Sequence, residues 1–395
     1  MCTDSHELSS VRILMLAITC CIIVANIYFN QSVLNLIAGS FPTEWKAVSL
    51  IPMATQLGYA AGLFLLIPLG DYIERQRLIL RQAQVLFLAL IGMMLSPTAS
   101  VLVFFSFLTG VAATVAQQIV PLAASLSRSS SRGKTVGMVM SGVLAGILAG
   151  RAIGGFIGQY FDWRGVFLSG AIMTLLAIFF IARILPSQSL PTPKFNYLAV
   201  LRSLGLLWKN EPQLRNATLT QALLFASFSV LWTALPFWLA HRYHYGAGIT
   251  GFLAVLGLIG ILCAPLAGSI SDRQGPFRII ILGVILMLLA WVVFWVWNSI
   301  VGMVVGILLL DAGEQCVLIA NQHTIYSLCP DARNRLNTLF MCVMFIGGAC
   351  GSLTATWLWE TTHNWTLIVA AGAGLVMLGM LIAIRRNTSS PQTGT

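Results

Sequence analysis

Charged residues are scarce in this sequence. Only 9% of its 395 residues are Asp, Glu, Lys or Arg, against roughly 25% in an ordinary soluble domain. These charges are too few to cover the two or three soluble domains that a chain of this length would otherwise suggest. Because 58% of the residues are hydrophobic and the mean hydropathy is +0.87, the composition predicts a membrane protein and excludes disorder.

Motifs for phosphate-driven or metal-dependent chemistry are also lacking. The sequence contains no Walker A loop, nucleophile elbow, HExxH or EF-hand pattern. None of its eight cysteines forms a CxxC pair or has the spacing of zinc ligands, so we interpret them as apolar packing residues. We therefore expect no enzyme activity, no cofactor and no metal site, and transport would have to draw on an ion or substrate gradient.

The net charge of +10 comes from 22 Lys and Arg against 12 Asp and Glu. The basic residues are scattered between apolar runs and form no long cluster, so membrane lipids are a better partner than nucleic acid. The first apolar run lacks a small-residue cleavage site before the next polar turn, which indicates a retained first span and not a signal peptide. We expect the protein to be monomeric.

Long apolar runs are what the sequence has instead. A bilayer core about 30 Å thick needs about 20 mainly apolar residues per helix. Twelve such runs lie between charged or Pro/Gly-rich breaks, so we predict an all-α membrane protein with twelve transmembrane helices. The predicted spans are 11–38, 47–69, 78–95, 99–126, 135–160, 164–185, 216–240, 249–270, 277–297, 300–327, 337–359 and 364–384.

Basic residues are divided unequally between alternate loops. Eighteen Lys and Arg gather on one side of the predicted membrane, three lie on the other side (Lys46, Arg164 and Arg242), and Arg151 falls inside a span. Cytoplasmic loops carry an excess of Lys and Arg, and an even number of spans returns the chain to its starting side. We therefore predict a multi-pass protein of the cell inner (plasma) membrane with both termini in the cytoplasm.

The longest connection divides the chain into two halves. We interpret residues 186–215, which carry proline and basic residues, as a cytoplasmic linker between six-helix bundles at 1–185 and 216–395. The halves repeat at a nearly constant offset, which is typical of secondary transporters with a site near the midplane between the repeats. The pairs at an offset of 201 are Asp71/Asp272, Arg132/Arg333, Lys134/Arg335, Gly146/Gly347 and Gly150/Gly351, and Trp163/Trp365 are 202 apart.

Two stretches at equivalent loops resemble a known family signature. PLGDYIERQRL (68–78) and GSISDRQGPFR (268–278) resemble the cytoplasmic Gly/Asp/Arg motif of the major facilitator superfamily. The resemblance covers essentially the whole chain and implies that superfamily's fold, two pseudo-symmetric six-helix bundles. An Asp at a helix end beside Arg can pair with a neighbouring helix and latch one closed state; anchoring by positive charge alone is the alternative. The residues expected to form this latch are Asp71, Arg75, Asp272 and Arg273.

The fifth predicted span resembles the antiporter signature of the same superfamily. Glycine recurs every four residues over 142–158 and leaves a bare ridge on which another helix backbone can approach closely. The signature expects a Gly-Pro pair where this chain has Gly150-Arg151, and the fourth span has Ser106 where many drug exporters of the family carry Arg. These departures keep a facilitator or a symporter open as alternatives to an antiporter.

Three charged residues lie well inside predicted spans: Arg151, Asp311 and Glu314. At 1.5 Å per residue, Arg151 lies roughly 16 Å in from Asp162 and Asp311 roughly 20 Å in from Asn298, which puts both close to the midplane. Each such charge costs about 3 kcal/mol or more and needs a partner or a function. We predict that Asp311, or Glu314 one turn further, binds the coupling proton and that Arg151 contacts substrate or gates access. An internal ion pair that sets helix register is the alternative.

Neutral polar side chains inside the spans predict a polar cavity. The resemblance implies that the first, fourth, seventh and tenth helices line this cavity. On the tenth span, Asp311, Gln315 and Gln322 fall within an arc of about 40°. For each side chain alone, an interhelical hydrogen bond is an equally good interpretation. The candidates for the substrate cavity are Asn26, Asn30, Gln56, Gln117, Gln118, Trp232, Gln315 and Gln322.

The resemblance extends to the bacterial drug:proton antiporter branch of the superfamily. It implies a secondary active transporter that exports small organic molecules, drugs or metabolites, in exchange for protons by alternating access. Its partners would be the small-molecule substrate, protons and membrane lipids. A facilitator or proton symporter for a metabolite is one alternative, and a non-transporting membrane sensor is another.

Overall fold

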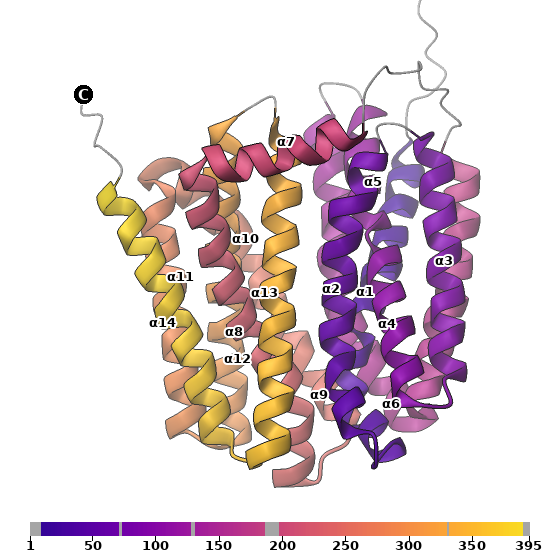
Figure 1. The fold of residues 1–395 in the computed structure, drawn as a ribbon, viewed down its shortest axis with the longest axis vertical. Coiled ribbons are helices and arrows are strands. Elements are labelled where there is room, and N and C mark those ends of the chain that lie inside the picture. The colour runs from indigo at the N-terminus through magenta and orange to yellow at the C-terminus, as the bar shows by residue number, and fades with distance from the viewer. Residues whose placement is uncertain (1–8, 71–72, 128–130, 186–196, 330–331, 390–395) are drawn as a thin grey trace, which may run out of the picture. The chain divides into compact units, whose positions relative to one another are not determined.

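The structure is a computed structural model, which describes residues 9–70, 73–127, 131–185, 197–329 and 332–389. These residues form fourteen α-helices and one short 3₁₀ helix (Figure 1). Helices dominate because a backbone surrounded by lipid must satisfy its N–H and C=O groups internally. The first six are α1 (Ser10–Ser40), α2 (Trp45–Leu69), α3 (Arg75–Leu95), α4 (Ala99–Ala113), α5 (Val115–Ser125) and α6 (Arg132–Ile184).

The second half begins with α7, a helix that runs across the direction of its neighbours in Figure 1. The helices of this part of the chain are α7 (Tyr197–Asn210), α8 (Pro212–Tyr243), α9 (Ala247–Ala254), the 3₁₀ helix η1 (Val255–Gly257), α10 (Leu258–Gln274), α11 (Pro276–Val296), α12 (Ile300–Leu328), α13 (Arg333–Thr362) and α14 (Trp365–Ser389).

Several predicted spans differ in detail from the observed helices. Ten helical stretches of the described residues are long and apolar enough to cross a membrane, and one of them is the 52-residue stretch Gly133–Ile184. It consists of two helices that meet at Asp162, whose backbone is not helical (φ 62°, ψ 171°), and these two helices correspond to the fifth and sixth predicted spans. The fourth predicted span, in contrast, is one apolar stretch that consists of two helices, α4 and α5, on either side of Thr114.

The eighth predicted span, 249–270, is not one continuous helix. It consists of α9, a 3₁₀ turn at Val255–Gly257, and α10. Gly251, Gly257 and Gly260 fall within this stretch, and their low helix propensity makes the α-helical hydrogen-bond pattern easier to interrupt. The eighth predicted span is therefore present, with a 3₁₀ turn inside it.

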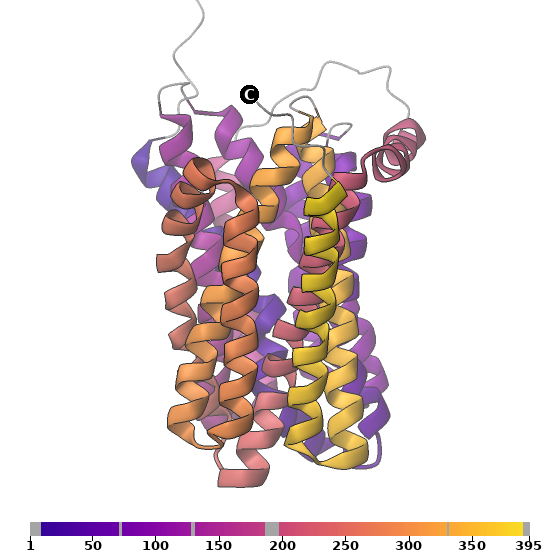
Figure 2. The ribbon, with the colours of Figure 1, turned by 90° about the vertical axis from the view of Figure 1, so that its left-hand side faces the viewer.

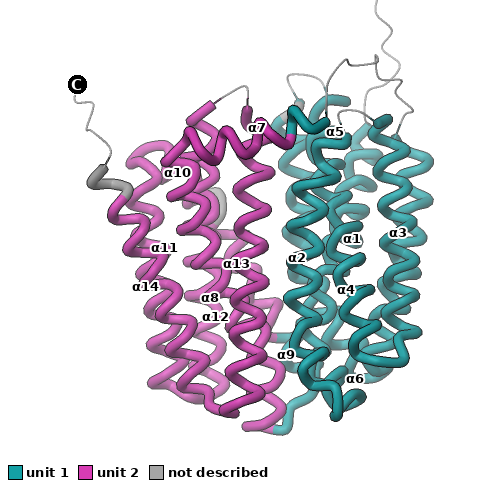
Figure 3. Tube along the Cα trace, in the orientation of Figure 1, with its two compact units in different colours: residues 1–200, 244–252 teal, residues 201–243, 253–395 magenta. Residues whose placement is uncertain are grey.

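The described helices divide into two compact units (Figure 3). Unit 1 comprises residues 1–200 and 244–252, and unit 2 comprises residues 201–243 and 253–395. Of the predicted linker, residues 186–196 lie outside the described residues, and the remainder forms α7 and the start of α8. The chain thus passes from unit 1 to unit 2 within α7.

Unit 1 is built on a close contact between α1 and α6. A Cβ atom on Gly146 would lie 2.5 Å from the carbonyl oxygen of Cys21, and one on Gly150 would lie 2.5 Å from that of Ala25. Only glycine permits such an approach, so the glycine ridge of the fifth span does bring another helix backbone close, as its pattern predicts. That helix is α1 of the same unit.

Unit 2 repeats this contact between α8 and α13. A Cβ on Gly347 would clash with the carbonyl group of Ala222, and one on Gly351 with that of Ala226. Both partners of each contact lie 201 residues after their counterparts in unit 1. The caps repeat as well: Thr98 accepts from the N–H of Val101, and Ser299 from that of Gly302. The duplication inferred from the sequence is therefore a duplication of packing.

The short helix α9 packs on α6 and explains why residues 244–252 group with unit 1. A Cβ on Gly155 would lie 2.5 Å from the carbonyl oxygen of Ala247 and 2.7 Å from the Cα of Gly251. The side-chain oxygen of Gln159 also accepts a hydrogen bond from the backbone N–H of Gly248 at 3.3 Å. The 3₁₀ turn follows directly after this contact.

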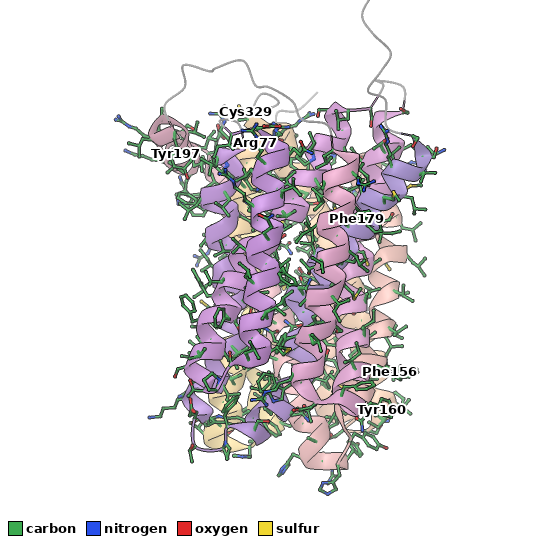
Figure 4. The ribbon with its side chains drawn as sticks, turned by 90° about the vertical axis from the view of Figure 1, so that its right-hand side faces the viewer. Arg77, Phe156, Tyr160, Phe179, Tyr197 and Cys329 are labelled. Atoms are coloured by element: carbon green, nitrogen blue, oxygen red, sulfur yellow. The ribbon has the colours of Figure 1, made fainter. Side chains whose placement is uncertain are left out.

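Apolar side chains cover the outside of each unit as well as its core. In unit 1, Figure 4 shows Phe156 and Tyr160 projecting at one end and Tyr197 at the other. Phe156 and Tyr160 are 61% and 69% exposed. Aromatic side chains near the ends of spans are typical of residues at the two membrane interfaces. The exposed apolar surface is therefore that of a protein surrounded by lipid.

Candidate functional site

Arg151 is held inside unit 1 by residues of α1. Its Nε donates to the side-chain oxygen of Gln31 at 3.0 Å, and its guanidinium carbon lies 4.9 Å from the ring centroid of Tyr28. The hydroxyl of Ser32 donates to its backbone carbonyl at 2.7 Å. Only 2% of Arg151 is exposed. Because Gly150 brings α6 onto α1, the arginine beside it is placed directly against these three residues.

In unit 2, Gln221 joins two polar residues of α12. Its side-chain N–H donates to Oε1 of Glu314 at 2.7 Å, and its side-chain oxygen accepts from the amide of Asn321 at 3.2 Å. Gln221 and Asn321 have no exposed surface, and Glu314 is 3% exposed. The two hydrogen bonds thus run in one direction, from Asn321 to Gln221 and from Gln221 to the carboxyl group of Glu314.

The second oxygen of Glu314 differs from the first. Oε2 is buried and accepts no hydrogen bond from any described residue. Asp311, 5% exposed, precedes Glu314 by one turn of α12. Two buried carboxyl groups so close repel each other when both are ionised, and one proton removes that repulsion. Gln221 can hold Oε1 in either protonation state, which leaves Oε2 as the atom that can take up or release the proton.

These charged groups break the symmetry of the repeat. The position equivalent to Arg151 in unit 2 is Ser352, whose hydroxyl accepts from Thr233 at 3.0 Å. The position equivalent to Glu314 in unit 1 is Ala113. The shared scaffold thus carries a cation in one repeat and two carboxyl groups in the other.

The two asparagine candidates on α1 form interhelical hydrogen bonds within unit 1. Asn26 donates to the hydroxyl of Thr174 on α6 at 3.2 Å, and Asn30 donates to that of Thr55 on α2 at 2.8 Å. Gln56 is buried in α2. For the two asparagines, these bonds are contacts that stabilise helix packing.

The remaining neutral candidates divide between the two units. Gln118 donates to the side-chain oxygen of Gln82 on α3 at 3.0 Å, and Gln117 hydrogen-bonds with Tyr59. Trp232 is fully buried beside Phe228, with ring centroids 6.2 Å apart. A Cβ on Gly260 of α10 would lie 2.7 Å from the Cγ of Gln315 on α12, which places Gln315 against the stretch that follows the 3₁₀ turn. Gln322 is half-buried on the same helix as Gln315.

The structure describes three of the four latch residues. Asp71 lies outside the described residues. The Nε of Arg75 donates to the carbonyl of Gly70 at 3.3 Å, and Arg273 is exposed near the end of α10. Oδ1 of Asp272 lies 3.1 Å from Nε2 of His323 on α12, so Asp272 contacts a neighbouring helix of unit 2 through a histidine, and the latch itself stays a prediction.

Sequence reasoning missed the residues that hold the charged groups. Gln31 and Tyr28 were visible only as part of ANIYFNQS (25–32), and nothing in the sequence links them to Arg151, which lies 120 positions after Gln31. Gln221 was one of many polar residues in spans, with no sign that it joins Glu314 to Asn321. These pairings depend on the rotation of each helix about its axis, which side-chain spacing alone does not reveal.

Comparison with known proteins places this arrangement in a recognised group. The sequence profile described as the Major Facilitator Superfamily matches residues 15–290 and 217–394. The chain is 37% identical over 387 residues to the "Putative uncharacterized transporter YgaY" of Escherichia coli (strain K12), covering 97% of both chains. It is 30% identical to the "Probable transporter SCO4007" of Streptomyces coelicolor, covering 94% of this chain and 86% of that one.

Solved structures show the same fold at low sequence identity. The xylose transporter XylE from E. coli aligns with a TM-score of 0.74 at 14% identity, over 97% of this chain and 99% of that one. A point mutant of the nucleoside transporter NupG aligns with a TM-score of 0.72 at 13% identity, over 94% and 99%. These likenesses confirm the all-α, twelve-helix fold in two six-helix bundles that the sequence predicted.

Proposed function

Because the chain belongs to the major facilitator superfamily, and is therefore a multi-pass membrane transporter, we propose that it exports small organic molecules in exchange for protons. The proposal places it in the cell inner membrane with both termini cytoplasmic, as the eighteen basic residues on one side favour. Transport proceeds by alternating access, in which the two repeats rock about a central site.

The observation that supports proton coupling is the carboxyl pair of α12. Glu314 is buried, its Oε2 accepts no hydrogen bond from a described residue, and Asp311 lies one turn away. Binding one proton lowers the cost of placing this pair in an apolar surrounding, and releasing it restores a charge. A carrier that alternates between these states moves a proton in each cycle.

A facilitator or proton symporter for a metabolite is the second candidate. It is favoured by Gly150-Arg151, where the antiporter signature expects Gly-Pro. A buried guanidinium stacked on Tyr28 and bonded to Gln31 could bind an anionic group of a substrate.

The purified protein in proteoliposomes separates these functions. Fluorescent amphipathic compounds and metabolites are screened for counterflow, and uphill movement of each hit is then measured with a pH gradient imposed. An exporter moves the compound against its gradient in exchange for protons and stops when nigericin collapses the pH gradient. Transport that is indifferent to nigericin identifies a facilitator, and movement of protons and substrate in the same direction identifies a symporter.

A prediction for the latch concerns Asp272 and His323. Asp272→Asn is expected to slow exchange between inward-open and outward-open states by up to about fivefold, the range of a solvent-exposed side-chain pair, without abolishing substrate binding. The groups are 69% and 41% exposed, which keeps the effect modest. The rate is measured by counterflow at equal pH on both sides.

Comparison of the double variant with the two single variants tests whether His323 is the functional partner of Asp272. If the two side chains act as a pair, Asp272→Asn/His323→Gln should be no slower than the slower single variant. Ser269→Ala, one turn earlier on the exposed surface of α10, is the control and should exchange at the normal rate. Loss of equilibrium binding with intact exchange would show that these residues belong to the substrate site instead.

A further inference from the structure

The helix α7 differs from the membrane-spanning helices in length and direction. It has 14 residues, too few to span a bilayer. Figure 1 shows its axis running across the direction of α8 and α13, and Figure 2 shows it nearly end-on. Its first residues belong to unit 1 and the rest to unit 2. The proposed transport cycle assigns no role to it.

Two hydrogen bonds fix the depth of α7 relative to the spans. In unit 1, the hydroxyl of Tyr197 donates to the backbone carbonyl of Leu65 at 2.8 Å. Leu65 is 47% exposed and lies four residues before the end of α2 at Leu69. In unit 2, Arg335, the third residue of α13, donates to the hydroxyl of Ser203 at 3.2 Å. Both Tyr197 and Ser203 are therefore level with the terminal turns of membrane-spanning helices.

The two faces of α7 differ in exposure. Leu204 is buried, and Leu201 and Trp208 are half-buried against the protein. The opposite face combines apolar and basic residues within an arc of about 80° at about 100° per residue. Those residues are Leu198, Arg202, Leu206 and Lys209, all exposed, with Leu198 at 69% and Leu206 at 51%.

A cationic cap completes the end of the helix. Arg215 donates from Nη1 to the carbonyl oxygens of Trp208 and Lys209, at 2.9 and 2.6 Å. Its guanidinium is occupied at the C-terminus of α7, whereas Arg202 and Lys209 project from the exposed face. The exposed face thus presents two leucines beside two positive charges.

We propose that this exposed face lies on the bilayer surface and binds the headgroups of anionic phospholipids. The leucines enter the boundary between headgroups and acyl chains, as in other interfacial amphipathic helices. Arg202 and Lys209 meet the lipid phosphates, whose negative charge complements theirs. Lipid is the expected occupant because α7 is anchored beside Leu65, an outward-facing residue of a membrane span, at the depth of the helix ends.

Local hydrogen exchange of the full-length protein in nanodiscs tests this proposal. Amides of residues 197–210 are compared in discs of phosphatidylcholine alone and in discs with an equal share of phosphatidylglycerol. Exchange in α7 is expected to be slower with the anionic lipid. Two basic side chains at an anionic membrane surface are expected to slow the exchange rate roughly tenfold or more. Arg202→Gln/Lys209→Gln is expected to lose this difference, and Leu198→Ser/Leu206→Ser to speed exchange in both kinds of disc.

A matched variant controls for charge. Lys46→Gln/Arg242→Gln also removes two exposed basic residues, from the loops predicted on the other side of the membrane, and should keep the full lipid effect. Unchanged exchange in α2 and α13 shows that each variant is folded. Equal exchange of the unaltered protein in both discs would overturn the proposal, as would a lipid effect that survives in Arg202→Gln/Lys209→Gln. Equal protection by inorganic phosphate would assign the face to a soluble anion instead. None of these readouts depends on transport.

Discussion

Asp311→Asn and Glu314→Gln are each expected to remove the response of uphill transport to a pH gradient. One pH unit corresponds to 1.36 kcal/mol per proton, which sustains roughly a tenfold substrate gradient when one proton is exchanged. In either variant, the ratio of substrate concentrations across the membrane should fall to about one, because an amide cannot bind and release the proton. Accumulation of substrate in proteoliposomes with an imposed pH gradient measures it.

Both variants should still bind substrate and exchange it at equal pH. The amide introduced by Glu314→Gln keeps an oxygen that can accept from Gln221, so the 2.7 Å hydrogen bond between these side chains can be retained. Glu360→Gln makes the same chemical change near the end of α13, outside the carboxyl pair, and should retain the full pH response. If Asp311→Asn keeps pH-driven transport, the proton role passes to Glu314. If both variants keep it, proton coupling through α12 is wrong.

The role of Arg151 is tested by combining its substitution with Asp311→Asn. If its charge interacts with Asp311 during the cycle, the effects of Arg151→Gln and Asp311→Asn on the exchange rate at equal pH should not add. Additive effects would show that Arg151 does not interact with Asp311 and acts through its contacts with Gln31 and Tyr28. Substrate affinity, measured in parallel, shows whether the guanidinium binds substrate.

Gly150→Ala is expected to lower the apparent unfolding temperature in detergent by several degrees. The new Cβ would lie 2.5 Å from the carbonyl oxygen of Ala25, so α1 and α6 would have to separate. Overpacking of this kind costs about 1–3 kcal/mol, and each kcal/mol shifts the midpoint by about 2–4 °C for 150–250 residues. Gly351→Ala should have a similar effect in unit 2, where the added Cβ meets the carbonyl of Ala226.

Gly137→Ala is the matched control on the same helix. Apart from its own stretch of helix, no described atom lies within 4 Å of the Cβ it would add, and alanine is favoured over glycine in a helix interior by about 1 kcal/mol. This variant should unfold at an equal or higher temperature. If Gly150→Ala and Gly137→Ala behave alike, the α1–α6 contact is not what requires glycine in the fifth span.

The repeat was readable from the sequence because equivalent packing needs equivalent residues. Gly146 and Gly347 each permit a close backbone contact, and their partners Cys21 and Ala222 are separated by the same offset of 201. The 3₁₀ turn inside the eighth span was not readable, because the apolar pattern of that span continues through residues 255–257. Packing of Gly251 against Gly155 places the first part of that span with unit 1, and this contact exists only in three dimensions.

The sequence by itself determined the membrane environment, the helical class, the duplication and the identity of the buried charges, because each follows from composition or from spacing along one chain. Only the tertiary structure decided which neighbours hold those charges. Arg151 lies on Gln31 and Tyr28, and Glu314 accepts from Gln221. The physical reason is that lipid-facing and buried surfaces are equally apolar, so hydropathy reveals where a helix lies but not which face it turns toward its neighbours.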